Sequence, residues 1–139
     1  MIFENEKSFA ELTEFSSVNK IVGASASMIE KSSVKEGFIL ETLLVKDPKD
    51  FGKGYGKELF INILSEINKP ILIYPFGIPY FSENGEDSTY SGRVKWDSME
   101  DMEKGKEELV NKFYLPLIKK SGRKFSVKET ENNIMITVF

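Results

Sequence analysis

Hydrophobic and polar residues follow two different periodicities in the first half of this chain. The run from Phe38 to Val45 is rich in residues that favour β-strands. From Tyr55 onward, apolar residues recur at helical spacing, and the helix should end before Pro70, because the residue preceding a proline is pushed out of the helical region. The apolar stripe consists of Leu59, Phe60, Ile63, Leu64 and Ile67. The pattern therefore predicts a strand over 38–45 and a helix from Tyr55 to Ile67.

Three further segments are expected around this unit. The nearly continuous apolar run from Pro70 to Pro75 predicts a strand covered on both faces. Its place after a strand and a helix implies a right-handed crossover and parallel pairing with 38–45. Residues 8–16 predict a short helix capped by Ser8, and residues 20–29 predict a strand antiparallel to 38–45.

Residues 76–97 combine aromatic side chains with Gly, Ser, Asn and Pro, a composition typical of an ordered loop. The aromatic residues are Phe76, Tyr80, Phe81, Tyr90 and Trp96. One interpretation is a lid that closes an edge of the core. The other is an acceptor-recognition loop in which acidic residues attract a cationic amine; those residues are Glu83, Glu86 and Asp87.

The last third of the chain predicts a helix followed by a hairpin. Ser98 and Asp101 have the spacing of a capping box at the start of a helix that runs to Ile118. Pro116 should kink this helix, and Gly122 suits its carboxyl-terminal cap. The expected hairpin consists of residues 123–130 and 134–139.

Composition narrows the classes of function. A chain of 139 residues suits one domain, 1–139, and a net charge of -3 gives no global reason to bind nucleic acid. The absence of Cys and His excludes thiol nucleophiles, disulfides and thiolate or imidazole metal sites within this chain, and no metal site is expected. Neither a signal peptide nor a membrane-spanning run is evident, so we expect a cytoplasmic protein that does not bind membranes.

The turn before the central helix carries the candidate chemistry. Gly52, Gly54 and Gly56 alternate with other residues at the expected helix start, where unpaired amides and the helix dipole form a seat for phosphate. Lys53 and Lys57 add positive charge. The spacing fits neither a Walker loop nor a dinucleotide-binding fingerprint. The same glycines also suit a tight turn that binds nothing.

This segment resembles motif A of the GNAT N-acetyltransferase superfamily, in which a strand ending in Val and a Pro precede [Gln/Arg]-x-x-Gly-x-Gly/Ala. Pro48, Gly54 and Gly56 match, whereas Phe51 replaces the Gln or Arg. The resemblance implies an α/β fold with a mixed, mostly antiparallel sheet, flanking helices and splayed central parallel strands. It also implies acetyl-CoA as co-substrate, held by strand residues Leu43, Leu44 and Val45 and by loop residues Phe51, Gly52, Lys53, Gly54, Tyr55, Gly56 and Lys57.

Two catalytic residues are suggested. Phe113-Tyr114 followed by Gly122 resembles a family signature whose Tyr protonates the departing CoA thiolate, although the glycine comes later than in the family. Glu41 is the only carboxylate within 38–45 and is a candidate base for the acceptor amine. The alternatives are a core aromatic for Tyr114 and a solvated or paired carboxylate for Glu41.

The expected function is transfer of an acetyl group from acetyl-CoA to a small-molecule or peptide amine, by direct attack in a ternary complex. The alternative is a non-catalytic GNAT-like protein that binds a protein partner, or binds CoA without turnover. Three departures from the family motivate this alternative: Phe51 and Glu107, which stand where the family has other residues, and the displaced glycine after Tyr114. A homodimer is compatible with either.

Overall fold

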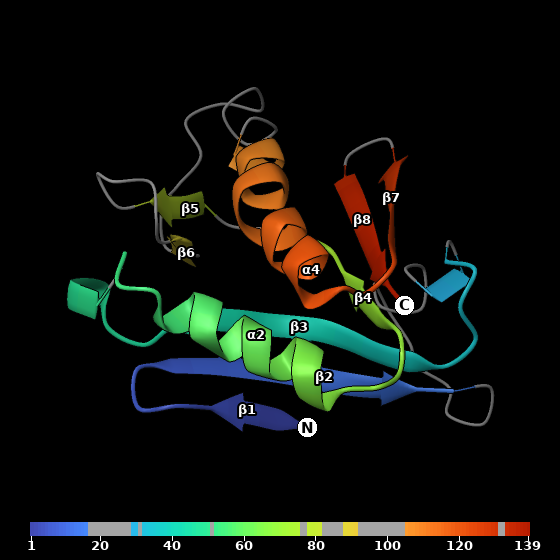
Figure 1. The fold of residues 1–139 in the computed structure, drawn as a ribbon, viewed down its shortest axis with the longest axis horizontal. Coiled ribbons are helices and arrows are strands. Elements are labelled where there is room, and N and C mark those ends of the chain that lie inside the picture. Colours follow the sequence, from blue (N-terminus) through green and yellow to red (C-terminus); the bar gives the residue numbers. More distant parts are fainter. Residues whose placement is uncertain are drawn as a thin grey trace.

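The computed structural model describes residues 1–16, 29–30, 32–50, 52–75, 78–81, 88–91, 105–130 and 133–139. A six-stranded sheet with the order β1-β2-β3-β4-β8-β7 forms its centre, and the helices α2 (Tyr55–Glu66) and α4 (Leu115–Ser121) cover one face (Figure 1). The strands are β1 (Ile2–Glu4), β2 (Ser8–Phe15), β3 (Gly37–Val45), β4 (Ile71–Ile73), β7 (Phe125–Thr130) and β8 (Asn133–Val138). Among the strands of the described residues only β3 and β4 pair in parallel, which confirms an α/β fold with a mixed, mostly antiparallel sheet.

The strand, helix and strand at the centre are confirmed. Helix α2 (Tyr55–Glu66) connects β3 to β4, and its predicted apolar stripe is buried. The parallel pairing runs only from Phe38 opposite Ile71 to Leu40 opposite Ile73. Beyond Leu40 the two strands diverge, as Figure 1 shows, while β3 continues to Val45. The parallel strands therefore separate toward their carboxyl ends.

The expected helix over residues 8–16 is wrong, because Ser8–Phe15 form strand β2. This strand pairs with β1 on one side and antiparallel to β3 on the other. Its alternating burial places Ala10 and Leu12 in the core beneath the helices, and neighbouring strands supply backbone hydrogen bonds that outweigh local helical preference. The antiparallel partner of β3 is thus β2 and not residues 20–29. Residues 17–28 lie outside the described residues, and Ile29 is helical.

Strand β3 contains an irregularity at Glu41. Glu11 of β2 pairs with Thr42, but the next residue, Leu12, pairs with Leu40, so Glu41 is an extra residue in β3. A bulge of this kind shifts the alternation of side chains by one position. As a result Leu40 and Leu43 both enter the core beneath the helices.

The helix before the terminal hairpin changes its winding. It is α-helical over 105–109, π-helical in η2 (Val110–Tyr114) and α-helical again in α4 (Leu115–Ser121). The Leu115 amide bonds to the Val110 carbonyl in η2, directly before Pro116, which has no amide to donate. The predicted disturbance at Pro116 therefore takes the form of a π segment. The capping box at Ser98 and Asp101 lies outside the described residues.

The predicted end of this helix is confirmed. Gly122 adopts a φ of 81° and donates its amide to the Lys119 carbonyl at 3.2 Å. Strands β7 and β8 then form the expected antiparallel hairpin. In this part of the chain, local sequence signals alone were sufficient to predict the end of the helix and the hairpin.

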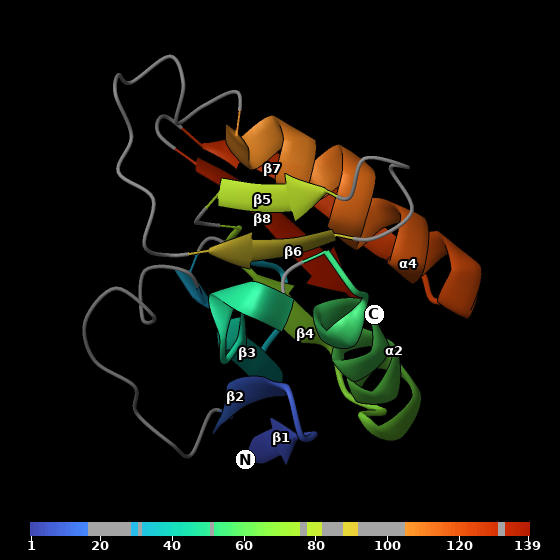
Figure 2. The ribbon, with the colours of Figure 1, turned by 90° about the vertical axis from the view of Figure 1, so that its left-hand side faces the viewer.

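The segment expected to be a loop contains two strands. β5 (Ile78–Phe81) and β6 (Ser88–Ser91) form an antiparallel hairpin, so the prediction of a loop is wrong for these residues. The backbone of β6 lies against β3, α2 and η2 (Figure 2). Tertiary neighbours thus order part of a segment whose local composition favours loops.

Candidate functional site

The turn that links β3 to α2 has the geometry that its glycines suggest. After Val45 the chain passes through a short 3-10 turn, η1 (Pro48–Asp50). Gly52 and Gly54 then adopt φ values of 76° and 86°, and Gly54 is the amino-terminal cap of α2. Side chains with a Cβ rarely adopt this conformation. The turn therefore requires glycine at these two positions, whether or not it binds an anion.

The start of α2 presents backbone amides toward the turn. Gly54 makes no side-chain capping hydrogen bond, and the Glu58 amide bonds to the Gly54 carbonyl at 2.9 Å. The amides of Tyr55, Gly56 and Lys57 precede this bond, so they have no acceptor within the helix. Together with the positive end of the helix dipole, these amides fit a phosphate or diphosphate.

A residue at the end of the β1–β2 turn contacts the first turn of α2. Ser8 is completely buried, with its hydroxyl 3.1 Å from the Tyr55 carbonyl and 2.7 Å from Asn5 Oδ1. The single hydroxyl hydrogen can serve only one of these two acceptors at a time. Through this contact Ser8 connects β2 to the first turn of α2. Ser8 is therefore not the helix cap that the sequence predicts, because it is the first residue of strand β2.

A buried carboxylate lies next to the glycine turn. Asp50 is only 5% exposed, and its oxygens lie 3.7 Å from Lys7 Nζ and 3.7 Å from Lys53 Nζ. Part of the positive charge expected from Lys53 is therefore compensated by Asp50. Lys57 has no ion pair with the described residues and is partly exposed. Sequence reasoning missed Asp50 and Lys7, because only the β2–β3 pairing brings Lys7 to this turn.

The strand residues expected to align a cofactor lie at the end of β3. Leu43 and Val45 are buried, whereas Leu44 is 38% exposed. On one side, this part of β3 pairs with Ser8–Ala10 of β2. β4 does not accompany it beyond Leu40, and β6 lies beside the strand. Phe51 lies outside the described residues.

The two proposed catalytic side chains occupy different surroundings. Tyr114 is 2% exposed in η2, with its ring 5.2 Å from that of Phe60 and 4.9 Å from that of Phe113, edge-on in both cases. Phe60 belongs to α2, so Tyr114 packs against the helix that starts at the glycine turn. Glu41 is half-buried at the β3 bulge, where the two parallel strands begin to separate.

Comparison with models of protein families, with curated proteins and with solved structures finds no match for this chain. None of the helices in the described part of the chain has the length and apolar character needed to cross a membrane. The features that bear on function are therefore the glycine turn, the pairing of β3 with β4 and the residues around them.

Proposed function

We propose that this protein is an acetyl-CoA-dependent N-acetyltransferase that transfers the acetyl group directly to an amine in a ternary complex. The observation that supports the proposal most strongly is the start of α2. Two glycines with positive φ lead into a helix whose first amides, those of Tyr55, Gly56 and Lys57, have no acceptor within the helix. The parallel pairing of β3 with β4, which ends at Leu40 while β3 continues to Val45, is the second feature in support.

Each group of residues has a distinct role in this proposal. The amides at the start of α2 and the Lys57 ammonium hold the diphosphate, and the backbone of Leu43–Val45 aligns the pantetheine arm. When bound, acetyl-CoA supplies an acyl group activated as a thioester. Glu41 accepts a proton from the acceptor amine, and the Tyr114 hydroxyl donates a proton to the sulfur that departs.

A non-catalytic role has one specific observation in its favour. The ring of Tyr114 is almost fully buried between Phe60 and Phe113, as a core aromatic would be. If Tyr114 serves only the core, the same turn and helix would bind CoA without turnover or support contact with a protein partner. The non-catalytic role predicts that no amine is acetylated, whereas both functions predict the same fold.

Titration with acetyl-CoA tests the binding step. A ligand that binds only the folded state raises the free energy of unfolding by about 2.7 kcal/mol at one hundred times its Kd. We expect acetyl-CoA to raise the melting temperature in a concentration-dependent manner, with free adenosine as the control. An unchanged melting temperature at millimolar acetyl-CoA would contradict the proposal.

Mass spectrometry of amines incubated with acetyl-CoA and protein tests the chemical step. The panel contains a polyamine, an aminoglycoside, free amino acids and a peptide with a free amino terminus. Tyr114→Phe should lower turnover and leave the Kd of acetyl-CoA unchanged. Equal turnover would remove Tyr114 from the mechanism, and binding without any acetylated amine would favour the non-catalytic role.

A further inference from the structure

The hairpin of β5 and β6 lies near the end of the parallel strand pair. The pairing of β3 with β4 stops at Leu40 and Ile73, whereas β3 continues to Val45. On its other edge β3 is paired with β2 as far as Val45, which lies opposite Ser8. A ligand that approaches Leu43–Val45 in the plane of the sheet therefore has to come from the edge that β4 no longer accompanies.

Strand β6 lies close to this part of β3. Its backbone is near β3, α2 and η2, and two views place it at the carboxyl end of β3 and the amino end of α2 (Figures 1 and 2). Because β3 carries Glu41 and η2 carries Tyr114, β6 lies against both elements that hold the proposed catalytic side chains. The hairpin is thus next to the helix start and to the strand that the proposed function assigns to acetyl-CoA.

Among the described residues, no strand pairing joins the hairpin to the central sheet. β5 and β6 form a separate sheet of two strands, in which Ile78 lies opposite Ser91 and Phe81 lies opposite Ser88. A hairpin of two strands has little stability of its own. Its position therefore depends on its contacts with β3, α2 and η2, and movement of the hairpin would break no ladder of the central sheet.

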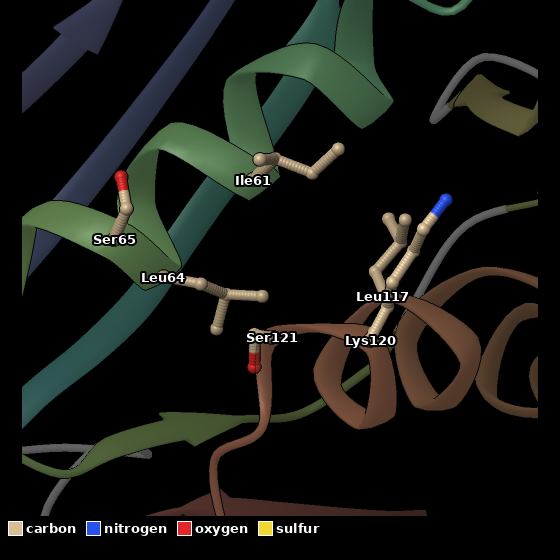
Figure 3. Close-up of a pocket in the computed structure, with 6 residues that line it drawn as sticks. All are labelled: Ile61, Leu64, Ser65, Leu117, Lys120 and Ser121. Atoms are coloured by element: carbon tan, nitrogen blue, oxygen red, sulfur yellow. The ribbon is translucent and has the colours of Figure 1, made fainter.

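The two helices beside the hairpin are held together by their own contacts. Helices α2 and α4 pack against each other, and residues of both line a pocket between them (Figure 3): Ile61, Leu64, Ser65, Leu117, Lys120 and Ser121. This packing joins α2 to α4 whatever the position of β6. The sheet and the helices therefore form a body against which the hairpin can move.

We propose that the β5–β6 hairpin is a lid that covers the end of β3 in the unliganded protein and moves away when acetyl-CoA binds. In the closed form, β6 takes up space beside Leu43–Val45 that the pantetheine arm requires. The proposal rests on the proposed function and adds a conformational step to it. Since acetyl-CoA binds only the open form, the apparent affinity is reduced by the fraction of the protein that is open.

Removal of the hairpin tests the effect of the lid on affinity. Because Ile78 and Ser91 lie opposite each other, a short Gly-Ser linker can replace residues 78–91 without displacing the chain on either side. If about a tenth of the unaltered protein is open, this variant should bind acetyl-CoA about tenfold more tightly in calorimetric titration. The matched control replaces only residues 82–87 with the same linker, keeps both strands and should bind as the unaltered protein does.

Distances between spin labels test the movement in the full chain. The chain has no Cys, so two introduced cysteines carry the only labels. The first pair is Ser88→Cys in β6 with Asn62→Cys, an exposed position of α2. The control pair is Asn62→Cys with Lys119→Cys, an exposed position of α4. We expect saturating acetyl-CoA to lengthen the first distance and to leave the second unchanged.

The outcomes separate the lid from the proposed function. If acetyl-CoA binds the unaltered protein and the distance from β6 to α2 stays the same, the hairpin is not a lid and the proposed function stands. The same conclusion follows if the folded variant without the hairpin binds acetyl-CoA no more tightly than the unaltered protein. If acetyl-CoA does not bind the unaltered protein, the proposed function fails and the lid fails with it.

Discussion

The amino end and the carboxyl end of helix α2 have contrasting surroundings. Its amino end begins at a glycine without a side-chain cap, whereas its carboxyl end is enclosed by one arginine. The Arg123 guanidinium donates hydrogen bonds to the backbone oxygens of Leu64 at 3.2 Å, Ile67 at 2.6 Å, Lys69 at 2.9 Å and Phe139 at 2.8 Å. Partial burial lowers the pKa of Arg123, although an arginine remains charged at any physiological pH.

The two ends differ in whether a side chain of the described residues satisfies their unpaired backbone groups. Carbonyls at the end of a helix need donors, and a positive charge there is favourable to the helix dipole. Arg123 meets both needs and joins the end of α2 to the residues beside β7 and β8. The amides of Tyr55, Gly56 and Lys57 receive no comparable side chain from Gly54. In the proposed function, the diphosphate of acetyl-CoA supplies the partner for these amides.

The largest change in the free energy of unfolding is expected at the carboxyl end of α2. Arg123→Ala should lower the free energy of unfolding by about 2–4 kcal/mol, because four carbonyls lose a charged donor and two of these hydrogen bonds are partly buried. Arg123→Lys should lower it by less, since lysine keeps the charge but not the planar fork. Urea denaturation measures both. The control is Lys124→Ala at the exposed neighbour, and equal stability of Arg123→Ala and Lys124→Ala would refute the role of Arg123.

A smaller loss of stability is expected next to the amino end of α2. Asp50→Asn keeps the shape of a buried side chain but removes the charge that Lys7 and Lys53 face at 3.7 Å. Because both lysines are partly exposed, the loss should be about 1–2 kcal/mol of unfolding free energy. The released lysines should at the same time tighten binding of acetyl-CoA. Urea denaturation and calorimetry test the two effects separately, and weaker acetyl-CoA binding would contradict the proposed charge balance.

Lys57→Glu should separate stability from binding. A negative charge in the first turn of α2 is favourable to the helix dipole, so unfolding free energy should rise by about 0.3–1 kcal/mol. Acetyl-CoA affinity should fall by about tenfold or more, because the charge next to the diphosphate changes sign. Lys119→Glu, near the carboxyl end of α4, is the control that should lose a little stability and keep its affinity. Unchanged affinity in Lys57→Glu would argue that no anion binds at this end.

The smallest change in stability is expected for an exposed ion pair near the carboxyl end of α2. Lys69 Nζ lies 2.9 Å from a Glu14 oxygen, and both side chains are about half exposed. Their hydrogen bond and the charge of Glu14 raise the pKa of Lys69 above 10.5. A raised pKa of a lysine in the folded state means that any stabilisation is present at neutral pH and disappears as the pH rises through that pKa. We expect Glu14→Gln to be only slightly less stable than the parent protein in urea denaturation at pH 7, and to match it above pH 11, where Lys69 loses its charge. A clear loss at pH 7 would show that exposed pairs matter here as much as Arg123.

Much of the fold was predictable because its signals are local. The helical spacing from Leu59 to Ile67 fixed the position of α2, and Gly122 fixed the end of α4. The apolar run before Pro75 identified the central parallel strand. The helix expected at residues 8–16 failed, because a short amphipathic segment satisfies either periodicity and the pairing with β1 and β3 decided between them.

The sequence by itself was sufficient to predict the position of the candidate phosphate site, because glycines before a helix permit a positive φ and leave the backbone amides uncovered whatever surrounds the turn. Only the tertiary structure decided what surrounds that turn. Lys7 meets Asp50 because β2 pairs with β3, and Arg123 reaches the end of α2 because the turn into β7 lies beside it. Contacts of this kind join residues far apart in the chain. They depend on the whole packing and leave no local pattern of spacing.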